Sequence, residues 1–138
     1  MVTTGYSGTP LLKKLGIKEN MRVMLIDEPG NYFGLLEKNI TEQFCKKKEK
    51  PDFIHLFAKT KKEFESGMRK LKSLIKPTTL IWISWYKKSA GIPTDLTEDV
   101  IRNYALQNDL VDIKVCAVSD VWSGLKLVVP VAKRSKNN

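Results

Sequence analysis

The chain has 138 residues, of which 42% are hydrophobic and 28% are charged, and its formal net charge is +9. This length is typical of one domain, and the composition excludes a wholly disordered chain. No apolar run reaches the roughly 18–20 residues that a membrane-spanning helix needs, and the first ten residues lack the pattern of a secretory signal. The sequence therefore predicts a cytoplasmic protein with no membrane partner. We expect one domain at 1–132 and a basic flexible tail at 133–138.

The positive charge raises the expectation of an anionic partner. It is concentrated in lysine-rich segments at 46–50, 59–62, 68–72 and 133–136. Lysines outnumber arginines, and no aromatic residues alternate with them as they do on surfaces that stack RNA bases. A solvated lysine-rich face is therefore the preferred interpretation, and nucleic-acid binding through that face is an alternative.

No motif identifies a catalytic group, a metal site or a cofactor. Cys45 and Cys116 have no closely spaced partners, so neither a disulfide framework nor a zinc knuckle is indicated. His55 is the only histidine, and its place within FIHLF is typical of a hydrogen-bonded core residue. Phosphate-loop, zinc and calcium patterns are absent. We therefore expect no catalytic residue, no metal and no cofactor.

The first half of the chain alternates short helices and strands. Thr9-Pro10 is typical of a helix start, and Gly16 is typical of a helix end. Asp27-Glu28-Pro29-Gly30 has the composition of a turn that ends a strand. The expected elements are a helix at 10–15, a strand at 21–26, a short helix from Tyr32, a short strand at 41–45 and a charged loop at 46–51.

The second half has clearer local signals. Thr60 and Glu63 are spaced as a capping box, and the helix that follows has one apolar face and ends at Pro77. The segment 80–85 is apolar on both faces, which is typical of a central strand in a parallel sheet. The remaining expected elements are a strand at 53–58, a helix capped by Asp95 and Glu98, and two strands at 111–118 and 125–131 joined by a turn at 119–124.

Strands that alternate with helices indicate an α/β fold with right-handed crossovers. The short turn at 119–124 makes the last two strands antiparallel neighbours. The predicted fold is a Rossmann-like three-layer sandwich whose mostly parallel sheet ends in an antiparallel hairpin. This element order resembles that of the S-adenosylmethionine-dependent methyltransferases. The resemblance implies a reversal of strand order between the strands at 21–26 and 80–85.

Ligands of such a sheet bind beyond the carboxyl ends of the strands, at the reversal of strand order. Two loops would border that crevice, and the second has the lysine charges, hydroxyl donor and glycine that suit an anion. The alternative is a polar loop whose lysines serve solubility. The expected ligand-binding residues are Lys87, Lys88, Ser89 and Gly91 on the second loop, and Asp27, Glu28 and Gly30 on the opposite wall. Trp85, Tyr86, Trp122 and Ser123 are expected to line the crevice.

Two features disfavour an active methyltransferase. Gly30 is the single glycine of the first turn and Pro29 removes a backbone donor, whereas the resemblance implies a glycine-rich turn. The segment 44–47 has cysteine and lysines where an acid would hold ribose hydroxyls. The main interpretation is a non-enzymatic domain that binds a small anion, a nucleotide or a protein partner. A divergent S-adenosylmethionine-dependent methyltransferase is the alternative, and nucleic-acid binding is a second alternative.

Three stretches are specific enough to suggest a family: YSGTPLLKKLGIK at 6–18, WISWYKK at 82–88 with TDLTEDVIR at 94–102, and VDIKVCAVSDVWSGLKLVV at 111–129. They resemble a bacterial family designated domain of unknown function 3052. The similarity spans nearly the whole chain, although proline is common in that family where this chain has Tyr86. The family has no assigned activity, so the resemblance implies one compact cytoplasmic domain and no mechanism.

Overall fold

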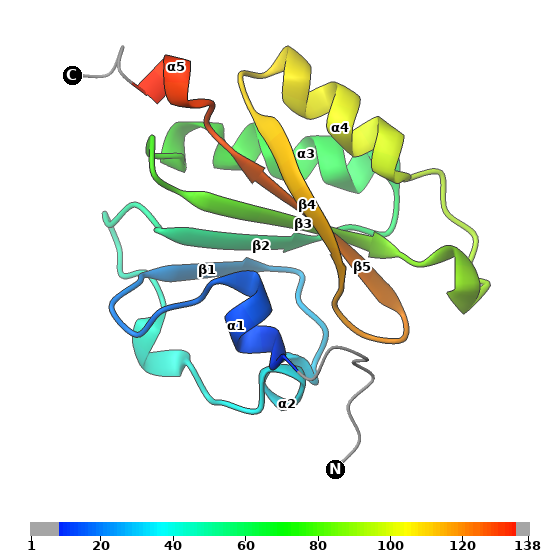
Figure 1. The fold of residues 1–138 in the computed structure, drawn as a ribbon, viewed down its shortest axis with the longest axis horizontal. Helices are drawn as coiled ribbons and strands as arrows, with labels where there is room; N and C mark the ends of the chain where they lie inside the picture. The colour runs from blue at the N-terminus through cyan, green and yellow to red at the C-terminus, as the bar shows by residue number, and fades with distance from the viewer. Residues whose placement is uncertain (1–8, 135–138) are drawn as a thin grey trace.

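The structure is a computed structural model that describes residues 9–134 (Figure 1). Its strands are β1 (Val23–Ile26), β2 (Phe53–Phe57), β3 (Leu80–Tyr86), β4 (Val111–Ala117) and β5 (Trp122–Val128). Its α-helices are α1 (Leu11–Leu15), α2 (Tyr32–Leu36), α3 (Lys61–Leu71), α4 (Glu98–Gln107) and α5 (Val131–Arg134). None of the helices in this part of the chain has the length and hydropathy needed to cross a bilayer.

The five strands form one sheet in the order β1-β2-β3-β5-β4. β2 is parallel to both β1 and β3, whereas β5 is antiparallel to both β3 and β4. The predicted mostly parallel sheet that ends in an antiparallel hairpin is therefore confirmed. The predicted reversal of strand order between β1 and β3 is wrong, because β2 lies between these two strands.

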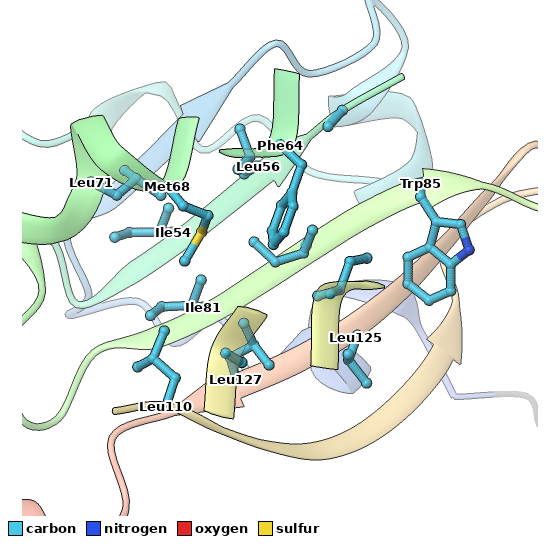
Figure 2. Close-up of a cluster of buried hydrophobic side chains, with 14 of the residues drawn as sticks. Ile54, Leu56, Phe64, Met68, Leu71, Ile81, Trp85, Leu110, Leu125 and Leu127 are labelled. Atoms are coloured by element: carbon cyan, nitrogen blue, oxygen red, sulfur yellow. The ribbon is translucent and has the colours of Figure 1, made fainter. Parts of the chain in front are cut away.

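The helices α3 and α4 cover one face of the sheet (Figure 1). The predicted capping box starts α3: the Glu63 backbone N–H donates to the Thr60 hydroxyl at 3.1 Å. The Glu63 carboxylate accepts from the Lys59 backbone N–H at 2.9 Å, one residue earlier than a capping box usually reaches. Figure 2 shows the core that results, in which Phe64 and Met68 of α3 pack over buried side chains of β2, β3 and β5.

The helices α1 and α2 cover the opposite face (Figure 1). Gly16 ends α1 with a φ of 84°, a left-handed conformation that favours glycine, so the predicted helix end is confirmed. The Trp82 indole N–H donates to the Leu15 carbonyl at 2.9 Å, which ties α1 to β3. The buried side chains of this second core include Leu15, Tyr32, Leu36, Phe53, Phe57 and Trp82. Two helical layers with a sheet between them make the predicted three-layer sandwich.

Several predicted boundaries differ from the structure. The strand predicted at 125–131 ends at Val128, and the strand predicted at 21–26 begins at Val23. Tyr86 and Trp122 are partners across β3 and β5, so Trp122 and Ser123 belong to a strand and not to a turn. The segment expected as a short strand is a 3-10 helix, Thr41–Gln43, followed by a single parallel bridge between Phe44 and Val23. Lys133 and Arg134, assigned by the sequence to a flexible tail, end the helix α5. The rest of that expected tail, 135–138, lies outside the described residues.

Candidate functional site

The carboxyl ends of β1 and β2 border a hollow of about 350 Å³, named here the Asp27 hollow. The chain turns sharply after β1, where Asp27 has a φ of 56° in the left-handed region that aspartate tolerates better than most residues. The hollow is lined by Asp27, Glu28, Phe57, Lys59, Glu63 and Trp122. Three carboxylates and two aromatic rings outweigh one lysine, so this lining favours a cationic or hydroxyl-bearing ligand.

A smaller hollow of about 200 Å³ lies beside β1 and shares Glu28 with the first. Phe44 is placed there by its backbone bridge to Val23, and the Cys45 backbone N–H donates to the Val23 carbonyl at 2.9 Å. This Phe44 hollow is lined by Val23, Met24, Leu25, Glu28, Phe44 and Cys45. An apolar hollow and an acidic one therefore share one exposed carboxylate, Glu28.

A larger hollow, about 740 Å³, lies at the carboxyl end of β3 and is named here the Lys87 hollow. Its walls are the connection from β3 to α4, the first turn of α4 and Ser123 of β5. Lys87 and Lys88 face this hollow together with the acids Glu98 and Asp99, so its lining carries both charges.

The predicted cap of α4 by Asp95 is wrong. Thr97 is the cap, since its hydroxyl accepts a hydrogen bond from the Val100 backbone N–H at 3.3 Å. The Asp95 carboxylate instead accepts from the Lys61 backbone N–H at 2.7 Å, at the start of α3. The Thr94 hydroxyl donates to the Lys59 carbonyl at 2.7 Å. These two bonds fasten the β3–α4 connection to the segment that also lines the Asp27 hollow.

A stacked aromatic pair stands between the two large hollows. The rings of Tyr86 and Trp122 have centroids 4.6 Å apart and an interplanar angle of 25°. Trp122 also meets Phe57 edge-to-face at 5.0 Å. Tyr86 lines the Lys87 hollow and Trp122 lines the Asp27 hollow. The stacked pair therefore joins the walls of these two hollows.

The structure separates the predicted site residues into two groups. Asp27, Glu28 and Trp122 line the Asp27 hollow. The other group lines the Lys87 hollow and consists of Trp85, Tyr86, Lys87, Lys88 and Ser123. The expected single crevice with lysines facing carboxylates does not form, because β2 keeps the two loops apart at the sheet edge. The role of these residues as ligand contacts stays a prediction.

Three other predicted residues, Ser89, Gly30 and Gly91, line none of these three hollows. Gly91 follows a 3-10 helix, Lys88–Ala90, and its φ of 70° explains why a glycine is needed there. A Cβ at Gly30 would meet nothing within 4 Å, so no close approach requires that glycine.

Three further residues line the Asp27 hollow and were not predicted from the sequence: Phe57, Lys59 and Glu63. All three follow or end β2, whose position along the chain was predicted correctly. A signal was therefore present, since residues after a parallel strand lie at the ligand edge of the sheet. It was overlooked because the wrong strand order placed β2 away from the crevice.

A buried hydrogen-bonded chain runs beneath this edge. The Tyr32 hydroxyl lies 2.8 Å from His55 Nδ1, and His55 Nε2 lies 2.7 Å from the Ser84 hydroxyl. His55 is 0% exposed, and burial lowers its pKa from 6.5 to about 3, which keeps the ring neutral. Burial, with a smaller contribution from Glu28, raises the pKa of Tyr32. The prediction that His55 is a satisfied core residue is confirmed.

Within residues 9–134, Cys45 and Cys116 are free thiols and no group of acidic, histidine or cysteine side chains is arranged to hold a metal ion. Burial is the largest cause of a raised pKa at both thiols. Neither side chain is therefore activated as a thiolate nucleophile.

No protein-family model and no curated protein matches this chain. A Streptococcus agalactiae protein of the NADB-Rossmann superfamily matches in fold, with a TM-score of 0.52 at 11% identity, over 91% of this chain and 70% of that one. The M1A22 tRNA methyltransferase of B. subtilis has a TM-score of 0.53 at 9% identity, over 87% of this chain and 65% of its own. The chain has a Rossmann-like, methyltransferase-type fold. The ribosomal protein L11 methylase of Lactobacillus delbrueckii has a TM-score of 0.52 at 10% identity, over 86% of this chain and 74% of its own.

These comparisons contradict the main interpretation drawn from the sequence, a non-enzymatic binding domain. The two structures above whose names state an activity are both methyltransferases, which favours the alternative of an S-adenosylmethionine-dependent methyltransferase. At 9% and 10% identity the likeness concerns the fold, so the activity of this chain is a proposal.

Proposed function

We propose that this protein is an S-adenosylmethionine-dependent methyltransferase. The observation that carries the proposal is the strand order, in which the antiparallel β5 is inserted between β3 and β4 next to three parallel strands. The fold likeness to two methyltransferases supports it. The Asp27 hollow at the carboxyl end of β1 and β2 is where a doubly wound sheet binds its ligands.

The lining of the hollows suits the methyl donor. When bound, S-adenosylmethionine supplies an electrophilic methyl group on a positively charged sulfur. The Asp27 and Glu28 carboxylates and the Trp122 ring attract a cation, and they lie on one hollow. Glu28 would accept hydrogen bonds from ribose hydroxyls, because it also borders the apolar Phe44 hollow, which would take the adenine ring.

This assignment also accounts for the turn after β1. A glycine-rich turn holds its ligand by backbone N–H groups, but Pro29 lacks one and the space around Gly30 is open. The Asp27 and Glu28 carboxylates would instead accept hydrogen bonds from ammonium or hydroxyl groups of the ligand. We assign the neighbouring Lys87 hollow to the methyl acceptor, because the Tyr86–Trp122 pair brings it next to the Asp27 hollow.

Calorimetric titration with S-adenosylmethionine and S-adenosylhomocysteine tests the proposal. We expect dissociation constants below about 1 mM, equivalent to about −4 kcal/mol. Glu28→Gln is expected to weaken both ligands about tenfold, since it replaces a charged hydrogen-bond acceptor by a neutral one.

Glu19→Gln is the matched control. Glu19 is also an exposed carboxylate, but it borders a different hollow, ahead of β1 at the amino edge of the sheet. It should leave both affinities unchanged. Absence of binding by the folded wild-type chain to either ligand at millimolar concentration would contradict the proposal.

We also propose that the chain belongs to the bacterial family designated domain of unknown function 3052 and acts in the cytoplasm. The three matching stretches support this assignment, and the most distinctive one, 111–129, forms the β4–β5 hairpin. Cell fractionation is expected to recover the protein with cytosolic markers. Recovery with membranes or the periplasm would contradict the proposed cytoplasmic location.

A further inference from the structure

Two lysines face each other on the β4–β5 hairpin. Lys114 and Lys126 are direct partners across these antiparallel strands. Like charges in this position repel each other and destabilise a sheet. Within residues 9–134 neither lysine has an ion pair or hydrogen bond through its side chain. The fold therefore maintains an unfavourable contact that an anion between the two ammonium groups would relieve.

Burial strengthens this effect at one of the two lysines. Lys126 is half-buried, and both burial and the charge of Lys114 lower its pKa. Its register partner on β3 is Trp82, which is fully buried in the core. Lys126 therefore extends from the sheet on the same side as Trp82, next to a packed ring.

A third lysine reaches the same area from α1. Cys116 is the register partner of Gly124, which lies two residues before Lys126 on the same side of β5. Lys14 and Lys114 are the two cations that oppose the burial-driven rise in the pKa of Cys116. Lys14 and Lys114 thus lie close to this thiol, and the surface formed by Lys114 and Lys126 is named here the Lys126 face.

Three carboxylates near β4 bind Arg102 of α4 and not the two lysines. Asp112 on β4 accepts from Arg102 of α4 at 3.1 Å, on the opposite side of the sheet. Glu98 and Asp99 bind the same guanidinium. These three acids therefore lie on the α4 side, and within residues 9–134 none of them pairs with Lys114 or Lys126.

The Lys126 face also leads to the proposed active site. Trp122 and Lys126 lie on the same side of β5, four residues apart, or about 13 Å at the usual rise of a strand. Trp122 lines the Asp27 hollow. A chain of phosphates on the Lys126 face would therefore approach the carboxyl edge of the sheet.

We propose that the Lys126 face binds the phosphate backbone of a nucleic acid, which is the methyl acceptor of this protein. The acceptor role rests on the proposed methyltransferase function, whereas binding to the lysines does not. RNA and DNA share this backbone chemistry, so the experiment must distinguish them.

The test is fluorescence anisotropy with labelled single strands of about 20 nucleotides, one RNA and one DNA, at about 50 mM salt and above. The variant Lys114→Ala/Lys126→Ala is expected to bind about tenfold more weakly than wild type. Its slope of log affinity against log salt concentration should fall in magnitude by about 1.4, because each lost phosphate contact removes about 0.7 for single strands. Stronger binding of one strand type identifies the nucleic acid.

The matched control is Lys70→Ala/Lys72→Ala, which removes two exposed lysines at the end of α3, on the other side of the sheet. This control changes the net charge by the same amount as Lys114→Ala/Lys126→Ala. Its affinity should nevertheless stay within about twofold of wild type, and its salt slope should stay within about 0.3 of wild type. Equal weakening by both double variants would overturn the proposal, because it would show a general charge effect. Binding that depends on these lysines for anionic lipid vesicles, with none for either nucleic acid, would also overturn it.

Lys114→Glu separates binding from folding. It replaces the like-charge pair by an opposite-charge pair with Lys126, so thermal stability should be unchanged or higher while nucleic-acid binding is lost. Calorimetry with S-adenosylhomocysteine distinguishes the two proposals. Nucleic-acid binding that depends on the lysines, without binding of S-adenosylhomocysteine, would refute the methyltransferase proposal alone. Binding of S-adenosylhomocysteine without nucleic-acid binding would refute the nucleic-acid proposal alone.

Discussion

The hydroxyl of Tyr32 on α2 lies 2.8 Å from Nδ1 of His55 on β2, inside the core between helix and sheet. The same ring reaches Ser84 on β3 through Nε2 at 2.7 Å, so one imidazole joins three elements. A neutral imidazole has one donor and one acceptor, and here both have a partner. Such a network specifies where α2 lies on the sheet, because a displaced α2 would leave buried polar atoms unpaired.

Tyr32→Phe is expected to lower the free energy of unfolding by about 1–3 kcal/mol, since it leaves the buried Nδ1 of His55 without a partner. Urea unfolding followed by circular dichroism measures this change. Tyr104→Phe is the control, because no hydrogen bond of the Tyr104 hydroxyl occurs among the described residues, and it should cost less than about 0.5 kcal/mol. Equal losses for the two variants would show that the hydroxyl of Tyr32 has no special role.

His55 makes stability depend on pH. Its pKa in the folded protein, about 3, lies below the ordinary 6.5, so the unfolded chain takes up the proton first on acidification. The contribution of His55 is full above pH 6.5 and is lost as the pH falls toward 3, with a slope of up to about 1.4 kcal/mol per pH unit.

The window between about pH 5 and 6.5 tests this dependence, because most carboxylates do not titrate there. Denaturant unfolding should show falling stability across that window for wild type. His55→Gln should be less stable at pH 7 but nearly independent of pH in the same window. A wild-type profile that is flat between these values would refute the buried neutral imidazole.

Gly124 makes room for the core on the α1 side of the sheet. A Cβ at this position would lie 3.0 Å from Val118 Cγ2 and 3.1 Å from Trp82 Cε3. Gly124→Ala is therefore expected to destabilise the fold by about 1–3 kcal/mol through overpacking against the tryptophan. Thermal unfolding measures the effect.

Gly34→Ala is the matched comparison for that substitution. Gly34 lies within α2 and a Cβ there would meet nothing within 4 Å. Alanine should raise the stability by up to about 1 kcal/mol through its better helix propensity. If both alanine variants shift the melting temperature in the same direction, the packing at Trp82 is not the cause.

Asp95 connects the β3–α4 loop to the first turn of α3 through the Lys61 backbone N–H at 2.7 Å. Asp95→Ala should cost about 0.5–2 kcal/mol, as the loss of a helix cap usually does. Asp120→Ala removes an exposed aspartate for which no hydrogen bond is found in the described part of the chain, and it should be nearly neutral. Hydrogen exchange should also show faster exchange at the start of α3 in Asp95→Ala alone.

Local signals in the sequence predicted several elements correctly. Thr60 and Glu63 start α3, Gly16 ends α1, and β3 is buried on both faces. Each of these features depends on residues within a few positions of one another. The start of β5 was placed too late, because Trp122-Ser123-Gly124 has a turn-like composition. Its strand conformation comes from pairing with Tyr86 and its neighbours, which are far away in the chain.

The candidate site was predicted in part. The rule that ligands bind at the carboxyl ends of parallel strands located Tyr86, Lys87 and Trp122 at hollows of the observed structure. The grouping of the residues was wrong because it depended on the order of the strands. A periodic apolar pattern shows that a segment is a buried strand, but it does not show which strand lies beside it.

By itself, the sequence determined an α/β domain with parallel central strands, an antiparallel hairpin at the end and a histidine held in the core. Charge and helix-capping patterns are local, so they can be read without knowing the fold. Only the tertiary structure decided that β2 separates β1 from β3, and hence that Asp27 and Glu28 face Phe57 and Lys59 and not Lys87. The pairing of Lys114 with Lys126 was likewise hidden, because cross-strand register is set by packing between distant segments.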